Sequence, residues 1–238
     1  MTSHLYRTLA AALSALAMLA AVPAQAQEGA PDLSWTGYYL GGSVGVSHMS
    51  TDMYSPTQTA PFGTAAGYPI PTYAGWHLHG GIHAGFDQQF GQTVLGIRLQ
   101  HIVSGSGPDT HWKKDEMLSA NPSAMTMLSA RAGYLVQPDL LGYVNASAVA
   151  GFFNYASVDE RWGQVDDSLD AIRVGVGIGG GFEFRLSDDV SFFTEFNHVS
   201  FLTGNSTFDY GPTSATKAWT YDFTHSINIV QAGVSRQF

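Results

Sequence analysis

The stretch LDAIRVGVGIGGGFEFRL, residues 169–186, alternates large apolar residues with small or charged ones. Successive residues of a strand point to opposite faces of a sheet, so this stretch predicts a β-strand with two very different faces. One face is bulky and uncharged: Ile172, Val174, Val176, Ile178, Phe182, Phe184 and Leu186. The other is small or charged: Arg173, Gly175, Gly177, Gly179, Gly181, Glu183 and Arg185.

The two faces indicate which side of a barrel each would line. Small residues fit a narrow barrel interior, and bulky apolar residues suit an exterior in contact with acyl chains. In a soluble up-and-down barrel the apolar face would point inward instead. The small, charged face therefore favours a membrane barrel over a soluble one.

Similar alternation recurs along the chain and predicts eight strands. We expect them at residues 35–49, 75–87, 93–103, 124–136, 141–155, 169–186, 190–202 and 222–238. Long connections at 51–73, 104–123, 157–167 and 203–221 alternate with short turns near 89–91, 137–139 and 187–189. Long loops at one end and short turns at the other are typical of outer-membrane barrels. The predicted fold is all-β: a closed, antiparallel, eight-stranded transmembrane up-and-down β-barrel.

The first 26 residues have the features of an export signal. Arg7 supplies a positive charge, Leu9 to Val22 is mostly apolar, and Ala24-Gln25-Ala26 fits a small-x-small cleavage site. We therefore expect a signal peptide at 1–26 and a barrel domain at 27–238. The predicted location is the bacterial outer membrane, with outer-membrane lipid around the barrel.

The composition agrees with that location. Only 12% of residues are charged, against about 25% in soluble domains. The chain has no cysteine, so no disulfide framework supports it. Its formal net charge of -9 argues against nucleic acid as a partner.

Aromatic residues gather near the ends of the expected strands, and we expect two belts at the headgroup levels. One belt would hold Trp35, Tyr38, Phe86, Tyr134, Tyr143, Phe184, Phe192 and Phe238. The other would hold Trp76, Phe152, Tyr155, Phe201 and Phe223.

Both ends of the barrel region are similar to a known family. The segments WTGYYLGG, residues 35–42, and VQAGVSRQF, residues 230–238, resemble the first and last strands of OmpA-like and opacity-type porin-family proteins of alphaproteobacteria. The resemblance implies that Phe238 is a signal for the barrel-assembly machinery. The long expected loops are longer than barrel closure needs, and loops on rigid scaffolds carry function, so we predict a structural or surface role in envelope integrity or adhesion, with possible host or envelope partners. We expect no enzymatic activity and no cofactor. Arg236 departs from the pattern, because an aromatic residue is usual there.

Several charged residues share the inward-facing side of the predicted strands. An eight-stranded barrel is just filled by side chains, and buried charges must pair. We therefore expect a salt-bridge plug, with a narrow porin-like channel as the alternative. The expected network comprises Arg98, Arg131, Arg173, Arg185, Glu183, Glu195 and Asp87.

Three histidines on one expected strand face suggest a metal or haem site. His77, His79 and His83 are spaced so that neighbouring rings could share a ligand. No cysteine or carboxylate cluster completes the set, so we expect a neutral polar lining and no metal.

One pair of residues supports an enzymatic alternative. His198 and Ser200 share the lipid-facing side near the outer rim, similar to the His-x-Ser pair of outer-membrane lipid A deacylases. There, histidine acts as general base for a serine nucleophile. Asp209 is the candidate for the third, orienting group of such an esterase.

Overall fold

A computed structural model describes residues 34–54, 69–105, 111–113, 116–159, 165–209 and 218–238, all without helix. Its strands are β1 (Gly37–Tyr54), β2 (Pro69–Phe90), β3 (Thr93–Ser104), β4 (His111–Lys113), β5 (Glu116–Gln137), β6 (Leu140–Asp159), β7 (Val165–Arg185), β8 (Val190–Phe201), β9 (Gly204–Asp209) and β10 (Ala218–Gln237). No helix in the described residues is long and apolar enough to cross a membrane. The predicted signal peptide lies outside the described residues, so it stays a prediction.

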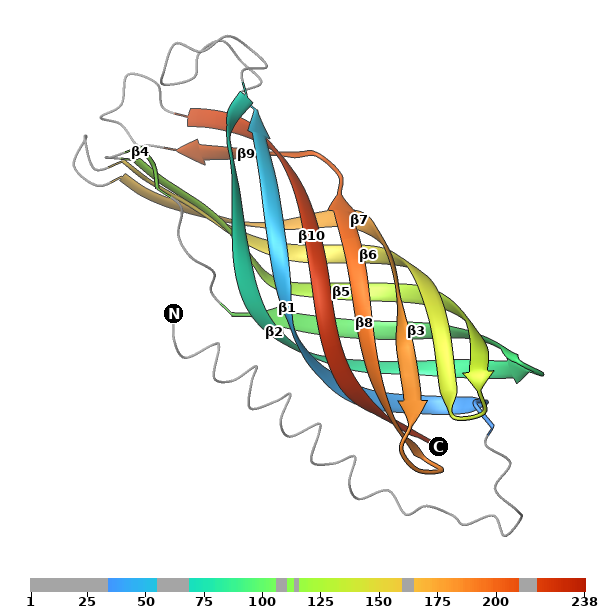
Figure 1. Cartoon of the computed structure of the whole chain (residues 1–238). Coiled ribbons are helices and arrows are strands. Elements are labelled where there is room, and N and C mark those ends of the chain that lie inside the picture. The colour runs from blue at the N-terminus through green and yellow to red at the C-terminus, as the bar shows by residue number, and fades with distance from the viewer. Residues whose placement is uncertain (1–33, 55–68, 106–110, 114–115, 160–164, 210–217) are drawn as a thin grey trace.

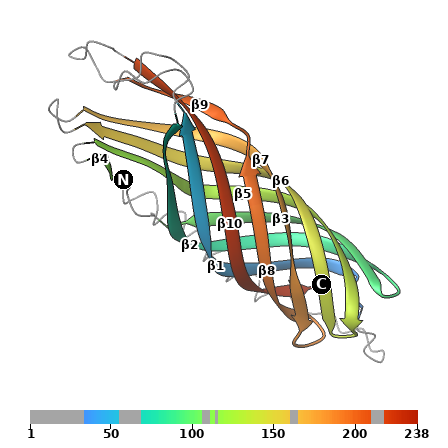
Figure 2. The same cartoon turned by 45° about the horizontal axis from the view of Figure 1, so that its top comes forward.

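The strands close into a barrel. Antiparallel ladders run in the order β1-β2-β3-β5-β6-β7-β8-β10, and a further ladder between β1 and β10 joins the two ends. The short strands continue this wall: β4 pairs with β5 and β9 pairs with β10. Figures 1 and 2 show the strands tilted against the barrel axis, with the C terminus at the end that carries the short turns. The predicted closed eight-stranded barrel is confirmed.

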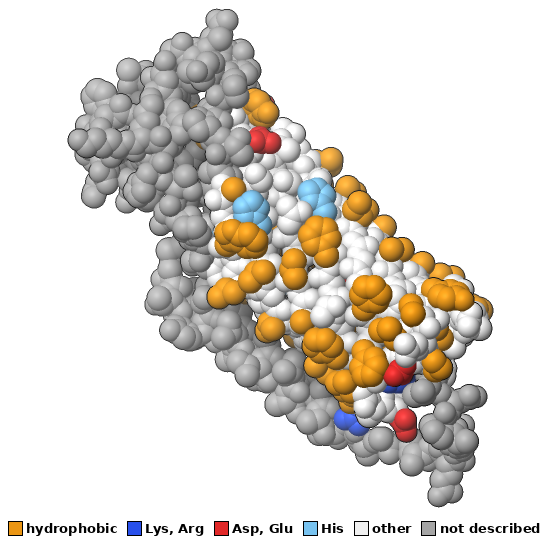
Figure 3. Space-filling view, viewed as in Figure 1, with side chains coloured by type: hydrophobic (Ala, Val, Ile, Leu, Met, Phe, Trp, Pro, Cys, Tyr) orange, Lys and Arg blue, Asp and Glu red, His pale blue; other side chains and the backbone are white. Residues whose placement is uncertain are grey.

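The alternation that predicted β7 is confirmed residue by residue. Ile172, Val176 and Ile178 point outward and are 64–68% exposed, whereas Glu183 and Arg185 point inward and are buried. The same division holds around the ring, because every ladder is antiparallel and keeps the two faces in register. Figure 3 shows the resulting apolar side chains spread over the outside of the barrel.

The turn between β2 and β3 is tight, so the two strands pair up to their ends. Between β2 and β3 the chain reverses through Gly91, whose φ of +62° lies in the left-handed region that favours glycine. The turn is tight enough that Phe90 and Thr93 are already a ladder pair. This end of the barrel therefore has little chain outside the wall.

The expected long connections are partly wrong, because the strands run further than predicted. β1 extends to Tyr54, β5 begins at Glu116, and β10 begins at Ala218. β4 and β9 also lie inside predicted connections. The reason is that an apolar outer face is needed only at the level of lipid; beyond it, the strands carry polar residues outward and resemble loops in sequence.

The barrel wall reverses its polarity along the axis. Toward the short turns, apolar residues face out and polar residues face in. Beyond a row that contains His48, His198 and Asn228, paired across β1, β10 and β8, the outward residues of β10 are polar and those of β1 are polar as far as Asp52, whereas Leu202 after β8 is apolar and exposed. The inward side there forms an apolar core of Met49, Met53, Ile102, Ala120, Met125, Met127, Val149, Phe153, Tyr155, Val199, Phe201, Tyr221, Phe223, Ile227 and Ile229.

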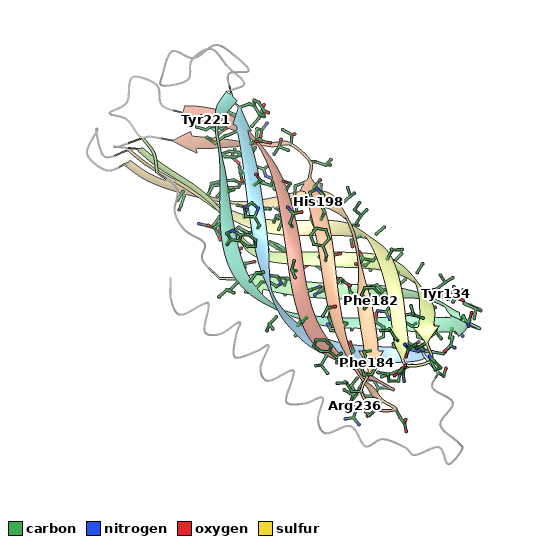
Figure 4. The ribbon with its side chains drawn as sticks, viewed as in Figure 1. Tyr134, Phe182, Phe184, His198, Tyr221 and Arg236 are labelled. Atoms are coloured by element: carbon green, nitrogen blue, oxygen red, sulfur yellow. The ribbon has the colours of Figure 1, made fainter. Side chains whose placement is uncertain are left out.

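This reversal corrects the predicted aromatic belts. Outward rings do lie near both rims, among them Tyr38, Tyr134 and Trp76, and Figure 4 shows Tyr134 and Phe184 near the end with short turns. Five other rings are buried inside the barrel: Trp35, Tyr143, Tyr155, Phe201 and Phe223. The last four fill the lumen because they occupy inward positions of their strands, and Trp35 lies just before β1.

Candidate functional site

Charged side chains from five strands meet inside the barrel at the level of the outward apolar residues. They are Asp87 of β2, Arg98 of β3, Arg131 of β5, Glu183 of β7 and Glu195 of β8. Each occupies an inward position in the alternation, and each is at most 7% exposed. We call these five residues the lumen charge cluster.

Arg131 joins two of the carboxylates. Its Nε donates to Asp87 Oδ1 at 3.0 Å and its Nη1 donates to Glu183 Oε2 at 2.8 Å. Its Nη2 also donates to the second oxygen of Asp87. The guanidinium carbon lies 5.3 Å from the ring centre of Tyr39 and 4.9 Å from that of Tyr143. The cation is thus held by two anions and two aromatic faces.

Arg98 and Glu195 form the second pair of the cluster. Arg98 Nη2 donates to both oxygens of Glu195, at 2.6 and 2.5 Å. Glu195 also accepts hydrogen bonds from the Tyr143 hydroxyl at 2.7 Å, from Asn197 Nδ2 at 2.6 Å and from Gln231 Nε2 at 3.0 Å. A buried carboxylate with this many donors is well satisfied.

Arg173 and Arg185 lie apart from the cluster, unlike the network expected from sequence. Arg173 donates to Asn205 O at 2.9 Å and to Ser206 Oγ at 2.6 Å, both on β9. Arg185 donates to Asp188 O at 2.7 Å and to Gln237 Oε1 at 2.6 Å, and its guanidinium lies 4.4 Å from the ring centre of Trp35. The alternation along a strand predicts whether a side chain points inward or outward, but it does not predict how far along the barrel axis that side chain lies. Arg173 and Arg185 both point inward, yet they lie at opposite ends of the barrel.

The three histidines of β2 line the lumen above the cluster. His77, His79 and His83 are all buried, and His83 Nε2 lies 2.9 Å from Ser235 Oγ. The ring of His83 packs edge-on against Phe193 with centroids 5.2 Å apart. Within the described residues, no group of three or more His, Cys, Asp or Glu side chains is placed to hold a metal ion.

Other side chains fill the lumen on both sides of the cluster. Toward the short turns lies a smaller apolar group of Trp35, Val94, Leu135, Leu141 and Tyr143. Above the cluster, Gln100 Nε2 donates to Gln231 Oε1 at 2.8 Å, and these amides lie below the large apolar core of the upper barrel. The interior is therefore a stack of apolar, charged, amide and apolar layers.

His198 and Ser200 lie on the outside of β8, as their strand parity predicts. Ser200 Oγ is 3.2 Å from His198 Nε2, and His198 Nδ1 is 2.8 Å from Asn228 Oδ1 on β10. Figure 4 labels His198 on the barrel wall, and Figure 3 shows histidine side chains bordering the apolar ones on this face.

The expected third partner, Asp209, is wrong. It lies on β9 opposite Ala218, far along β10 from Asn228. Asn228 escaped detection because it is 28 residues or more from both partners in sequence, and only the β8–β10 register brings it beside His198. An alignment of the last two strands by their apolar faces could have identified it.

An open groove of about 850 Å³ lies on the outside of the same wall. Its outward lining comes from β3, β5, β6, β7, β8 and β10, and it extends to the end with the short turns: Thr93, Ala132, Tyr134, Gly142, Val144, Gly180, Phe182, Thr194, Phe196 and Val230. Phe196 and Val230 are a ladder pair two residues from His198 and Asn228, so the groove begins next to them.

Phe238 closes the seam between the two ends of the sheet. Its backbone N–H donates to Tyr38 O at 2.8 Å, while its side chain is 53% exposed on the outside. The ring is therefore accessible next to the last ladder pair.

Comparison with known proteins agrees with this architecture. The sequence profile of the outer membrane protein beta-barrel domain matches residues 12–238. The outer membrane protease OmpT of Escherichia coli has a similar structure, with a TM-score of 0.53 and 7% identity over 90% of this chain and 99% of that one. Neisserial surface protein A gives a TM-score of 0.40 and 14% identity, over 83% of this chain and 97% of that one. The attachment invasion locus protein Ail of Yersinia pestis gives 0.39 and 9%, over 84% and 99%. No match was found among curated protein sequences.

The expectation that the protein is not an enzyme is corrected by these comparisons. It rested on the lack of a common catalytic pattern in the sequence, yet an outer membrane protease has a similar overall fold. The fold therefore does not exclude catalysis, and activity has to be argued from particular residues.

Proposed function

The chain belongs to the outer membrane protein β-barrel family, and on that premise we propose that it is a filled, non-conducting barrel whose extracellular end is an interaction surface. It resides in the bacterial outer membrane. The observation that carries the proposal is the lumen charge cluster, in which buried side chains from five strands bond to one another across the interior.

The charge pairing favours a plug over the alternative of a narrow channel. Selectivity filters present rings of one sign of charge to an aqueous path. Here two arginines and three carboxylates are paired, and every ion pair of the cluster is buried. Apolar layers lie on both sides of them. Eight-stranded barrels are filled by side chains, and open aqueous channels need about 16 strands.

The extracellular wall supports the second half of the proposal. On β10 the outward residues from Thr220 to Asn228 are polar, whereas Val230 and Val234 are exposed apolar residues. At about 3.4 Å per residue, the segment 220–228 adds about 30 Å along the strand beyond the apolar belt. A rigid wall of this kind presents the connections at its end, and connections on rigid scaffolds carry binding functions. The partners we propose are envelope or host molecules.

The interaction surface is tested by replacing its connections one at a time. Residues 55–68, 106–110, 160–164 and 210–217 are each exchanged for a short Gly-Ser segment in the full-length protein. We expect at least one replacement to reduce host-cell binding or to increase leakage of periplasmic contents. Resistance to SDS before boiling should remain, which shows that the barrel is folded. If all four folded variants keep wild-type binding and leakage, the surface role is contradicted.

A further inference from the structure

A buried histidine lies within the apolar core of the extracellular section. His225 of β10 is 1% exposed, and its ring stacks on Phe153 with centroids 4.5 Å apart and an interplanar angle of 13°. The ring of Phe223 is also nearly parallel to it, at 6.0 Å. Both ring nitrogens have polar partners: Nδ1 lies 2.9 Å from Thr51 Oγ1 on β1, and Nε2 lies 2.6 Å from the hydroxyl of Tyr155 on β6.

A further hydrogen bond fixes the direction of this chain. Arg173 Nε donates to the Tyr155 hydroxyl at 3.3 Å, and a guanidinium can only donate. The one proton of Tyr155 is therefore donated to His225 Nε2, which must be unprotonated. The ring proton of His225 then lies on Nδ1 and is donated to Thr51. The chain runs from Arg173 through Tyr155 and His225 to Thr51, and it requires a neutral imidazole.

The same arginine holds β9 at the end of the barrel. Its Nη2 donates to Asn205 O at 2.9 Å and to Ser206 Oγ at 2.6 Å. Gly204 leaves room for the guanidinium, because a β-carbon at this position would collide with it. Figure 1 shows β9 beside β10 at the end away from the C terminus. The chain therefore connects the buried histidine to a strand of the extracellular wall.

Proton uptake by His225 is incompatible with this order of hydrogen bonds. A protonated Nε2 would become a donor to the Tyr155 hydroxyl, which already accepts from Arg173. The proton of Tyr155 would then have no acceptor among the described residues. Two cations would also compete for one hydroxyl oxygen, so the bond between Tyr155 and Arg173 weakens when His225 is charged.

No described carboxylate faces His225 to stabilise its charged form. The titratable or charged groups that face it are the Tyr155 hydroxyl from β6 and Arg173 from β7. On the flanking stretches of β1 and β10, Asp52 and Asp222 occupy outward positions. A charge on His225 would therefore be buried beside a second positive charge.

Burial lowers the pKa of His225, and the charge of Arg173 lowers it further, from the ordinary value of 6.5 to about 3. A state in which water reaches the ring takes up the proton more readily than the closed state. The advantage of the closed state is therefore complete above pH 6.5 and is lost as the pH falls towards 3. Between these values, the ratio of open to closed molecules rises about tenfold for each pH unit.

We propose that Arg173, Tyr155 and His225 form an acid-sensitive lock on β9, which holds the strand in place at neutral pH and releases it when His225 takes up a proton. Release of Arg173 lets water reach the imidazole. The lock regulates the extracellular interaction surface, and in this respect it rests on the proposed function, because β9 continues the extracellular wall.

The simpler explanation is that His225 is a core histidine with satisfied hydrogen bonds. It would then affect the stability of the whole barrel, and β9 would show no acid response of its own. Amide exchange separates the two explanations, because it is measured segment by segment.

The test follows amide hydrogen exchange of the folded protein in lipid vesicles at pH 7.5, 5.5 and 4.5, without any partner. Rates are divided by those of unstructured peptides of the same sequence at the same pH. We expect corrected exchange of 204–209 to be about tenfold faster at pH 5.5 than at pH 7.5, and about a hundredfold faster at pH 4.5. Residues 191–197 of β8, in the membrane section, should not respond.

Two variants test the chain itself. His225→Gln keeps a hydrogen-bonding side chain that does not titrate, so exchange of 204–209 should change less than about twofold between pH 7.5 and 5.5. Tyr155→Phe removes the link to Arg173; it should speed exchange at pH 7.5 and leave a pH response of less than about twofold. His101→Gln is the matched control, since His101 faces outward and bonds to Thr126, and it should keep the tenfold response.

Nuclear magnetic resonance of the wild type, labelled with ¹⁵N in its histidines, reports the tautomer without any substitution in the measured protein. We expect the His225 ring to carry its proton on Nδ1 at pH 7.5, with its signal assigned by its loss in His225→Gln. A proton on Nε2 would contradict the direction of the chain and overturn the proposal.

The proposal is also overturned if wild-type exchange of 204–209 changes less than about twofold down to pH 4.5, or if folded His225→Gln or Tyr155→Phe keeps the full response. These outcomes are distinct from failure of the proposed function. A missing acid response leaves the interaction surface intact, whereas four connection replacements with wild-type binding and leakage would remove that surface and leave the lock.

Discussion

At the scale of single residues, Arg131 is the cation that Asp87 and Glu183 share, since it forms a buried ion pair with each of them. Arg131→Ala leaves two buried carboxylates without their cation. Breaking a buried pair in this way costs about 3–5 kcal/mol. We therefore expect the free energy of unfolding, measured by urea titration in lipid vesicles, to fall by about that amount.

The ion pair between Arg236 and Asp189 is the control for Arg131. Its side chains are 30% and 42% exposed, so the pair is well solvated. Arg236→Ala should lower the free energy of unfolding by less than about 1 kcal/mol. Equal losses for the two variants would mean that the buried cluster contributes no more than a surface pair.

The sequence predicts the face of each charged residue but not its partner. Alternation places Arg98, Arg131 and Arg173 on inward positions alike. Only the stagger of the strands decides that the first two meet carboxylates and that Arg173 reaches β9. The same limit applies outside the barrel, where Ser200 and His198 are visible in sequence but Asn228 needs the ladder register.

At the scale of elements, β9 is the strand most dependent on one side chain. In the described sheet it forms its ladder with β10, while Arg173 of β7 reaches its other edge through Asn205 O and Ser206 Oγ. Hydrogen bonds from a charged group contribute about 1.5–3 kcal/mol. Arg173→Ala should therefore speed hydrogen exchange of the amides in 204–209 at least about tenfold.

Arg185 provides the comparison for Arg173, since its hydrogen bonds lie at the end with short turns. Arg185→Ala should leave exchange in 204–209 unchanged. Unaltered exchange in Arg173→Ala would show that β9 is held by β10 alone.

The C-terminal residue, Phe238, follows the last strand of the barrel. Phe238 presents an exposed ring next to the β1–β10 seam, and we expect the assembly machinery to recognise it. Deletion of Phe238 should lower the outer-membrane level of the protein far more than deletion of Pro61. Phe238→Ala separates the ring from the backbone hydrogen bond and should also lower that level. Wild-type levels of all three variants would refute the assembly role.

Strands were predictable from sequence where they contact lipid and less so beyond it. β7 and β8 have bulky residues at most of their outward positions, which gives a strong period of two. In the upper parts of β1 and β10, inward Met53 and Phe223 belong to the core while their outward neighbours are polar. Together with proline and glycine nearby, that pattern is typical of loops as well as of strands.

At the scale of the whole molecule, the barrel combines two kinds of wall. The membrane section has a mainly polar interior with a small apolar group toward the short turns, and its outside is apolar; the extracellular section has an apolar core and a largely polar outside. Closure of the sheet satisfies the backbone groups of every strand, so the fold does not depend on disulfides, and the sequence has no cysteine. Both sections are filled, which is the basis for assigning a non-conducting role.

Single-channel recording in planar bilayers tests that central claim most directly. The protein is inserted after its SDS resistance has confirmed folding, and the current is followed at a range of voltages in symmetrical salt. We predict no steady ion conductance, because the paired charges of Arg98, Arg131, Asp87, Glu183 and Glu195 and the apolar layers around them occupy the interior. Large, stable, ion-selective current steps from the wild-type protein would contradict the filled barrel and establish a channel instead.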